Sequence, residues 1–257
     1  MFRYKLIVLD LDGTLLNSKK EITEGNLAVL QKARENGALI AFSTARSEGA
    51  MREYIAAVQP DILISNGGAL VERNGEVLFN KQLSADSVRH IIKRCFELSE
   101  GKCEITIDTD HGYFWNYKPD CDFSRYETPD NVQHSDFMDF SCPAYKVTAE
   151  VEREEDARKI AGEIPDCGTL SFRGEIWRRF AHIEATKRNA LEHICGKLLI
   201  EPKEILAFGD DYNDVEMLEL CTGVAMGNAI PEVKAAAEFV TDTNDNDGVA
   251  KFILSAI

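Results

Sequence analysis

The sequence lacks the features that mark several classes of protein. It has no cysteine pair spaced C-x-x-C, and its seven cysteines are scattered and odd in number, so we expect neither a disulfide framework nor a zinc site. No uncharged apolar stretch is long enough to span a bilayer, and charged residues interrupt the first positions, where a signal peptide would need an apolar core. The sequence therefore predicts a cytoplasmic protein with no membrane partner.

Basic residues are scarce as well. Lysine and arginine number 29 against 44 aspartate and glutamate residues, which gives a formal net charge of −15. Nucleic-acid binding normally needs a basic face, so this balance predicts no nucleic-acid partner. The motifs G-x-x-x-x-G-K-[ST], G-x-G-x-x-G, G-x-S-x-G and H-E-x-x-H are also absent. Their absence argues against nucleotide-loop, dinucleotide, serine-hydrolase and zinc-protease chemistry.

Acidic side chains follow an apolar run near the start of the chain. Residues 6–9 predict a buried strand, after which Asp10 and Asp12 come two residues apart, just before Gly13. Alternation along an extended chain would project both carboxylates to the same side. Because a buried strand that ends in paired carboxylates gathers negative charge, a cation is expected there. This segment predicts a chemical site.

A second acidic segment follows another apolar strand. Residues 205–208 run into Gly-Asp-Asp-Tyr-Asn-Asp at positions 209–214. Taken alone, this segment fits an acidic loop that caps the following helix.

The chain has 257 residues, of which 44% are hydrophobic, so it is long enough for two domains with sizeable cores. Strand and helix patterns alternate through residues 1–82 and again through 184–257, which predicts parallel strands in a doubly wound α/β domain. Residues 83–183 instead show paired antiparallel strands with helices, which predicts an inserted α+β domain. Within it, residues 119–143 have no period and predict a loop with short helical pieces.

Four short segments occur together in a recognisable order: Asp-Leu-Asp-Gly-Thr at 10–14, Ser-Thr-Ala-Arg at 43–46, Lys187, and the acidic segment at 209–214. With this order and spacing the chain resembles the haloacid dehalogenase superfamily of phosphatases, and within it the Cof-type branch. Segments 223–229 and 246–250 also resemble that branch. The resemblance implies a Rossmann-like core, with residues 83–183 as a C2B-like cap that supplies substrate specificity.

The resemblance implies roles for the acidic residues. Asp10 would be the nucleophile that forms an aspartyl-phosphate, and Asp12 the general acid and base. The metal ligands would be Asp10, the backbone carbonyl of Asp12, Asp210, and Asp214 either directly or through water. The implied cofactor is Mg²⁺, which prefers oxygen ligands.

The resemblance also implies a set of phosphate and substrate contacts: Thr44, Arg46, Asn66, Lys187 and Asn213. Alternatives stay open for several of them. The Thr44 hydroxyl could instead cap the next helix, Arg46 could pair with a carboxylate, and Asn66 could belong to a plain turn.

Two departures from the family pattern accompany these contacts. Ala45 stands where the family usually has glycine, and alanine at positive φ would be strained. The loop before Lys187 is short, so Lys187 could be a solvated residue at a helix start, or its role could fall to Arg188. In the middle domain, an aromatic-rich group could line a pocket or form core: Trp115, Tyr117, Phe123, Arg125 and Tyr126.

The function implied is Mg²⁺-dependent hydrolysis of small phosphomonoesters, such as sugar phosphates or phosphorylated cofactors. Two alternatives remain at this point. One is a phosphomutase of the same superfamily, in which a sugar hydroxyl rather than water accepts the phosphoryl group. The other is a non-enzymatic signalling module that accepts phosphate on an aspartate, although such modules are about half as long and have no inserted domain.

Overall fold

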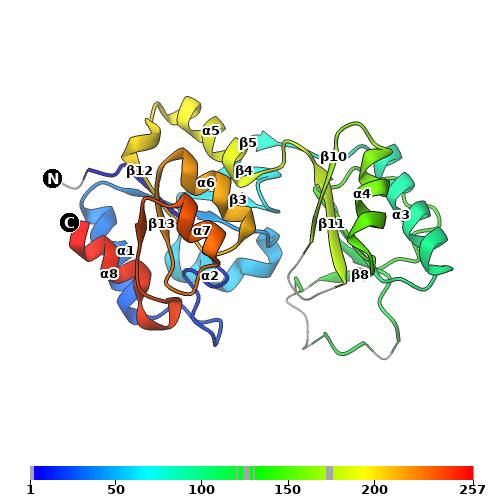
Figure 1. Ribbon diagram of the computed structural model, residues 1–257, viewed down its shortest axis with the longest axis horizontal. Coiled ribbons are helices and arrows are strands. Elements are labelled where there is room, and N and C mark those ends of the chain that lie inside the picture. The colour runs from blue at the N-terminus through cyan, green and yellow to red at the C-terminus, as the bar shows by residue number, and fades with distance from the viewer. Residues whose placement is uncertain (1–2, 120, 124–127, 130, 172–175, 257) are drawn as a thin grey trace. The chain divides into compact units, whose positions relative to one another are not determined.

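The computed structural model describes residues 3–119, 121–123, 128–129, 131–171 and 176–256 (Figure 1). The chain divides into two compact units. The first contains Met1–Arg46, Met51–Phe79 and Thr186–Ile257, and the second contains Ser47–Ala50 and Asn80–Ala185. The sequence predicts limits after residue 82 and before residue 184, and it does not place residues 47–50 in the second unit.

The first unit is built on an eight-stranded sheet in the order β14-β13-β12-β1-β2-β3-β4-β5. The pairs from β14 to β3 are parallel, and β4 runs antiparallel to β3. The central strands are uninterrupted apolar runs, as expected where helices cover both faces of a parallel sheet. The strands are β1 (Leu6–Leu9), β2 (Leu39–Ser43), β3 (Ile62–Ser65), β4 (Leu70–Arg73), β5 (Glu76–Asn80), β12 (Ile205–Gly209), β13 (Thr222–Ala225) and β14 (Phe239–Val240).

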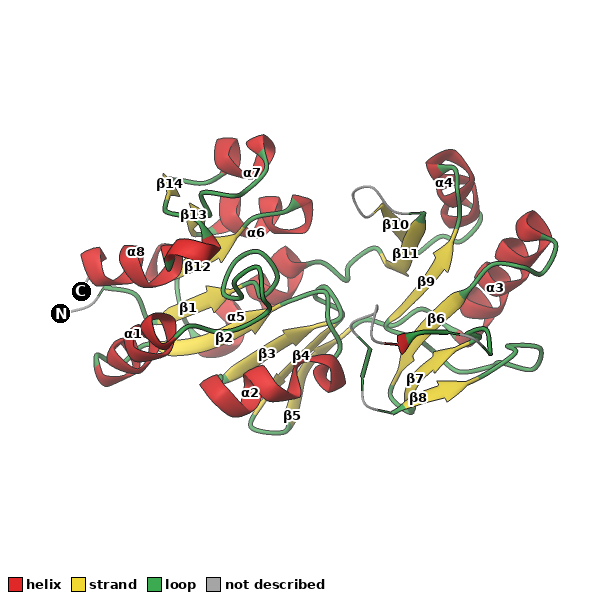
Figure 2. Cartoon of the chain, turned by 90° about the horizontal axis from the view of Figure 1, so that it is seen from below, coloured by secondary structure: helices red, strands yellow, loops and turns green. Residues whose placement is uncertain are grey.

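The α-helices of the first unit pack as two groups, one made of α1, α2 and α8 and the other of α5, α6 and α7 (Figures 1 and 2). The fold is therefore the doubly wound α/β arrangement that the sequence predicts. The helices are α1 (Glu24–Glu35), α2 (Arg52–Val58), α5 (Lys187–Leu198), α6 (Val215–Leu220), α7 (Pro231–Ala236) and α8 (Gly248–Ala256), with 3₁₀ turns η3 (Pro202–Glu204), η4 (Tyr212–Asp214) and η5 (Asn244–Asn246). The 3₁₀ turn η1 (Glu48–Met51) crosses the boundary, because residues 48–50 belong to the second unit.

Threonine caps fix where two of these helices begin. The Thr23 hydroxyl accepts from the backbone N–H of Asn26 at the start of α1, and the Thr186 hydroxyl accepts from that of Asn189 at the start of α5. The sequence pattern predicts a helix from residue 189, but the Thr186 cap makes Lys187 the first helical residue. That shift places Lys187 at the buried end of α5.

The second unit is a six-stranded sheet with two α-helices, α3 (Ala85–Ser99) and α4 (Glu154–Gly162). Its strand order is β10-β11-β9-β6-β7-β8, and all described pairs are antiparallel except β7 with β8. Figure 2 shows α3 and α4 beside this sheet. The strands are β6 (Ile105–Thr109), β7 (Gly112–Trp115), β8 (Val132–His134), β9 (Lys146–Glu150), β10 (Cys167–Ser171) and β11 (Trp177–His182).

The prediction of loop and helical pieces over residues 119–143 was wrong at β8. This strand is a short sheet edge of three residues, Val132–His134, of which only Val132 is apolar, so no alternation marks it. Trp115 of the aromatic-rich group is buried and packs edge-on against Tyr117 and Phe123, with ring centroids 5.9 and 5.5 Å away. These rings pack on one another, and Arg125 and Tyr126 lie outside the described residues. Within the described part of the chain, no helix is both long and apolar enough to cross a bilayer.

Candidate active site

The strand order of the first unit joins two acidic segments that lie far apart in the sequence. Strand β1 lies between β2 and β12, and Leu9 is opposite Phe208 in the parallel register. Asp10 follows β1 directly and Asp210 follows β12, so both lie at the carboxyl edge of adjacent strands. This is where open α/β sheets bind ligands, because the strand order reverses there.

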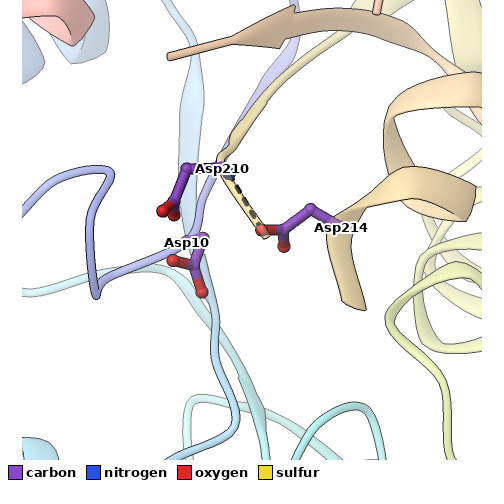
Figure 3. Close-up of side chains that lie close together, drawn as sticks. All are labelled: Asp10, Asp210 and Asp214. Carbon is purple, nitrogen blue, oxygen red and sulfur yellow. Dashed lines mark hydrogen bonds between the residues drawn. The ribbon is translucent and has the colours of Figure 1, made fainter. Parts of the chain in front are cut away.

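Three carboxylates meet at this edge. Asp10, Asp210 and Asp214 each offer one oxygen, and these oxygens all lie within 4.8 Å of one another (Figure 3). Asp10 is 6% exposed and Asp214 is fully buried, which makes the negative charge costly unless cations balance it.

Lys187 supplies one such cation. Its ammonium group donates to Asp10 Oδ1 at 2.7 Å and to Asp214 Oδ1 at 2.6 Å, and the residue is only 1% exposed. Arg188 instead pairs with Glu192 at the surface, 3.0 Å away. The bridging residue is therefore Lys187 and not its neighbour, and the short loop before it still delivers it to the carboxylates.

Asp214 also holds the loop after β12. Its Oδ2 accepts from the backbone N–H groups of Asp210 and Asp211, at 3.0 and 3.1 Å. Asp211 in turn caps η4 by accepting from the backbone N–H of Tyr212, and its own side chain is exposed. Because Lys187 and these amides engage both oxygens of Asp214, the geometry fits a direct metal contact by Asp210 better than one by Asp214.

The loop after β1 approaches Asp210 closely, and Gly13 makes this possible. Gly13 has φ +75°, and a Cβ built on it would lie 2.3 Å from Asp210 Oδ2, so only glycine fits. Next to it, the buried Thr14 donates from its hydroxyl to Asp210 Oδ1 at 3.0 Å. The Asn228 amide donates to the carbonyl of Gly13 at 2.7 Å and holds the loop from the other side.

The electrostatics of this cluster favour a bound cation. Burial is the largest cause of the raised pKa of Asp10. The carboxylates of Asp214 and Asp210 raise this pKa further, whereas Lys187 lowers it. Burial and then Asp214 raise the pKa of Asp210 to about 7. Burial would lower the pKa of Lys187, but Asp10 and Asp214 outweigh it and raise that pKa. A divalent cation would relieve the repulsion among the carboxylates, so this donor set fits an oxygen-liganded metal.

Asp12 lies in a separate ion-pair network. Arg46 donates from Nε to Asp12 Oδ2 at 2.8 Å and from Nη2 to Oδ1 at 2.7 Å, and Lys20 donates to Oδ1 at 2.7 Å. Tyr54 contacts both basic residues: the Arg46 guanidinium lies over its ring, and its hydroxyl donates to the backbone carbonyl of Lys20. Burial acts to raise the pKa of Asp12, but Arg46 and Lys20 outweigh it and lower that pKa. Of the two roles open to Arg46, the structure shows the pairing with a carboxylate.

The loops after β2 and β3 are tied together at the same edge. Thr44 is buried, its hydroxyl accepts from the backbone N–H of Arg46 at 3.2 Å, and the backbone N–H of Asn66 donates to the Arg46 carbonyl at 2.8 Å. Ala45 is not among the residues with positive φ, so the strain expected there is absent. Gly68 has φ +97°, and a Cβ on it would lie 2.2 Å from the Thr186 backbone, so this loop packs tightly against the start of α5. Contact of Thr44 and Asn66 with a phosphate stays a prediction.

The remaining predicted contact, Asn213, lies in η4 between the acidic residues of the motif. Its amide Oδ1 is buried and has no hydrogen-bond partner among the described residues. A buried acceptor of this kind fits a ligand that donates to it, and its role in phosphate binding also stays a prediction.

Sequence reasoning gave no role to Thr14, Lys20 or Asn228, although the structure places all three on site residues or their loops. Thr14 and Asn228 lie inside the segments 10–14 and 223–229 that carry the resemblance, so their positions were usable signals. Lys20, at φ 62°, reaches the site through the tertiary fold, and no local pattern connects it to Asp12.

Comparisons with known proteins agree with this geometry. A family model described as haloacid dehalogenase-like hydrolase matches residues 7–253. The 5-amino-6-(5-phospho-D-ribitylamino)uracil phosphatase YitU of Bacillus subtilis is 30% identical and covers 96% of both chains. The phosphatase YwpJ of the same organism is 28% identical over 96% of this chain and 97% of its own.

A solved structure gives the same result for the fold. The crystal structure of a haloacid dehalogenase-like hydrolase from Bacteroides thetaiotaomicron superposes with a TM-score of 0.84 and 26% identity, covering 99% of this chain and 100% of that one. The resemblance drawn from the four motifs is thereby confirmed. The chain belongs to the haloacid dehalogenase-like hydrolase family and is a hydrolase, and the relatives YitU and YwpJ are named as phosphatases.

Proposed function

We propose that this hydrolase is a Mg²⁺-dependent phosphatase that hydrolyses small phosphomonoesters through an aspartyl-phosphate on Asp10. One observation carries the proposal: a buried lysine, Lys187, bridges Asp10 and Asp214 beside Asp210. A cation fixed on the nucleophile and next to the incoming phosphate stabilises the charge that moves during phosphoryl transfer.

Asp10 and Asp12 divide the reaction into two displacements. In the first, an Asp10 oxygen bonds to phosphorus, the bond from phosphorus to the ester oxygen breaks, and Asp12 gives that oxygen its proton. In the second, water attacks phosphorus and gives its proton to Asp12, and the Asp10 carboxylate leaves with release of phosphate.

Arg46 and Lys20 keep Asp12 ionised in the structure described here, because they lower its pKa. Protonation of Asp12 for the first displacement therefore requires that its contacts with these cations loosen. Thr44, Asn66, Asn213 and Arg46 are proposed as the groups that contact the phosphate or the rest of the substrate.

Asp10, Asp210 and the backbone carbonyl of Asp12 would hold the Mg²⁺, with Asp214 acting through water or through the loop that it anchors. The bound ion supplies positive charge that offsets repulsion between the Asp10 carboxylate and an anionic substrate. Thr14 donates to Asp210, and Gly13 leaves room for this carboxylate, so both residues would help to hold Asp210 in place for this role.

We further propose that residues 83–183 act as a cap that selects the substrate, in a cytoplasmic enzyme. The substrate class is sugar phosphates or phosphorylated cofactors. The name of the relative YitU supports this class, since it specifies a phosphate ester on a ribityl chain.

A phosphatase screen tests the proposal. The purified protein is assayed for phosphate release from a panel of phosphorylated metabolites, with Mg²⁺ and with EDTA. Asp10→Asn should abolish turnover and leave the far-ultraviolet circular dichroism unchanged. The matched control is Asp211→Asn, which alters an exposed neighbour and keeps a good capping residue. Mg²⁺-independent release, or full activity in Asp10→Asn, would contradict the mechanism.

The phosphomutase alternative shares the first displacement and differs in the acceptor. Incubation with hexose phosphates, followed by separate measurement of free phosphate and of isomerised ester, distinguishes the two. We expect phosphate to accumulate, and isomerisation without phosphate release would replace the phosphatase proposal.

A further inference from the structure

One loop of the first unit contacts both acidic segments of the candidate active site. It consists of residues 226–230, which connect β13 with α7, and we call it the spacer loop. Asn228 in this loop donates from its side-chain amide to the backbone carbonyl of Gly13 at 2.7 Å. The backbone N–H of Ile230 donates to the backbone carbonyl of Asp210 at 3.1 Å. The spacer loop therefore joins the segment that follows β1 to the segment that follows β12.

The spacer loop is itself held in place. The backbone N–H of Gly227 donates to the carbonyl of Asp242 at 3.0 Å, and the Lys234 ammonium donates to the carbonyl of Gly227 at 2.6 Å. The Asn228 side chain is held at both ends of its amide, because its Oδ1 accepts from the backbone N–H of Asn244 at 3.0 Å. Asn228 is exposed to solvent, yet these contacts fix the direction of its side chain.

Gly13 is the position at which the loop after β1 can move most easily. Glycine has more backbone freedom than any other residue, and Gly13 adopts φ +75°. On one side of it is the backbone carbonyl of Asp12, a proposed metal ligand, and on the other is Thr14, which donates to Asp210 Oδ1. A rotation at Gly13 would therefore displace one proposed ligand and the partner of another. The hydrogen bond from Asn228 restrains this rotation, because it holds the Gly13 carbonyl.

A fixed separation between ligand loops affects which cation binds. Mg²⁺ needs nearly ideal octahedral geometry with oxygen ligands at about 2.0–2.1 Å, whereas Ca²⁺ accepts variable geometry at about 2.3–2.6 Å. A site that loosens should therefore lose affinity for Mg²⁺ before it loses affinity for Ca²⁺.

We propose that Asn228 is a positioning residue that raises the affinity of the site for Mg²⁺ relative to Ca²⁺. It does so by holding the Gly13 carbonyl at a fixed separation from the Asp210 segment. Asn228 is not one of the groups proposed to bind the metal or the phosphate, so it acts through Gly13. The inference rests on the metal site of the function proposed above.

The test measures metal binding in the absence of substrate. Dissociation constants of Mg²⁺ and Ca²⁺ are obtained from the rise in the urea midpoint of the first unit, followed by circular dichroism at a series of metal concentrations. Because loss of a group that orients a metal ligand weakens binding about tenfold to a hundredfold, Asn228→Ala should weaken Mg²⁺ binding at least about tenfold. Ca²⁺ binding should weaken less than about threefold, since its geometry is more tolerant.

The matched control is Asn246→Ala. Asn246 is an exposed asparagine of the same unit, and its amide donates to the side chain of Asp242 and not to the loop after β1. This variant should keep both dissociation constants at their wild-type values.

Each outcome of the test decides a separate question. A wild type that binds neither cation refutes the proposed metal site and this inference with it. If the wild type binds Mg²⁺ but Asn228→Ala keeps the wild-type ratio of the two constants, whether both are unchanged or both rise equally, the inference alone fails.

A second variant decides if Asn228→Ala does not fold. Lys234→Met frees the Gly227 carbonyl and so loosens the spacer loop without altering Asn228. The lost charge acts on both cations, so the ratio of their dissociation constants reports the loosening. This ratio should shift toward Ca²⁺, and an unchanged ratio would refute the inference.

Discussion

At the scale of single residues, Lys187 balances the charge of two buried carboxylates. It lies between Asp10 and Asp214, at 2.7 and 2.6 Å, and all three are nearly inaccessible. Replacing it by methionine leaves two carboxylates facing each other without a cation.

We therefore expect Lys187→Met to lower the free energy of unfolding by about 3–5 kcal/mol, as when one partner is removed from a buried ion pair. Urea denaturation without metal measures the change. Arg188→Met, which removes an exposed pair with Glu192, should change stability by less than about 1 kcal/mol. Equal midpoints for the two variants would show that Lys187 is not needed for charge balance.

Asp108 gives the second unit a predictable pH dependence. Burial is the main cause that raises its pKa in the folded protein, and Lys146 opposes the shift. Above the unfolded pKa of about 4, the folded state therefore holds more protons than the unfolded chain, and stability falls as the pH rises through the folded pKa. Asp108→Asn has no titrating carboxyl group at this position, so its stability does not fall for this reason.

The prediction concerns the free energy of unfolding of Asp108→Asn compared with that of wild type. The difference, variant minus wild type, should increase from pH 4 upward by about 1.4 kcal/mol for each unit by which the folded pKa is raised. Tryptophan fluorescence in urea at a series of pH values measures it. A difference for Asp108→Asn that stays constant with pH would mean that its pKa is not raised.

Individual site residues could be predicted from the sequence only where they lie in a motif. Asp10, Asp210 and Asp214 follow apolar strands, and the structure brings them together as that position suggests. The pairing of Arg46 with Asp12 was one of two open readings, because an arginine side chain has several partners within reach. Lys20 could not be found from the sequence, since only the folded turn brings it to Asp12.

At the scale of elements, periodicity and caps predicted most helices and central strands, and the exceptions have physical causes. The start of α5 at Lys187 was missed because apolar periodicity begins only after the polar first turn. Strand β8 was missed because a three-residue edge strand buries too little to show alternation. Nothing in the sequence pattern showed that β12 pairs with β1, which depends on long-range packing.

The cap of α5 offers a prediction at this scale. Thr186→Ala should cost about 1 kcal/mol of stability, with a range of roughly 0.5–2, because the Asn189 N–H loses its acceptor. Thr23→Ala removes the equivalent cap of α1, which also holds Asp247, and should cost at least as much.

The two variants should differ in activity. Thr186 precedes Lys187, so Thr186→Ala should lower kcat at least tenfold by loosening the lysine, whereas Thr23→Ala should keep kcat near wild type. Equal kcat in both variants would show that the α5 cap does not position Lys187.

At the scale of the whole molecule, the two units have separate apolar cores. Both tryptophans, Trp115 and Trp177, belong to the second unit, so tryptophan fluorescence reports its unfolding alone. Circular dichroism reports both units. The carboxylates expected to bind Mg²⁺ all belong to the first.

Mg²⁺ at a hundred times its dissociation constant should therefore stabilise the first unit by about 2.7 kcal/mol. In urea denaturation followed by circular dichroism, the part of the transition that comes from the first unit should move to higher urea. The fluorescence midpoint should stay fixed, and Asp210→Asn should remove the shift seen by circular dichroism. A fluorescence midpoint that moves together with circular dichroism would show that the units unfold as one.

The place of β1 in the sheet affects how the protein is made. In the finished fold this strand is central, between β2 and β12. During synthesis, however, β1 leaves the ribosome early and remains a sheet edge until β12 has emerged, with the whole second unit translated in between. A nascent chain that stops short of β12 exposes the apolar edge of β1 to aggregation. Such a chain carries Asp10 but cannot assemble the carboxylate cluster.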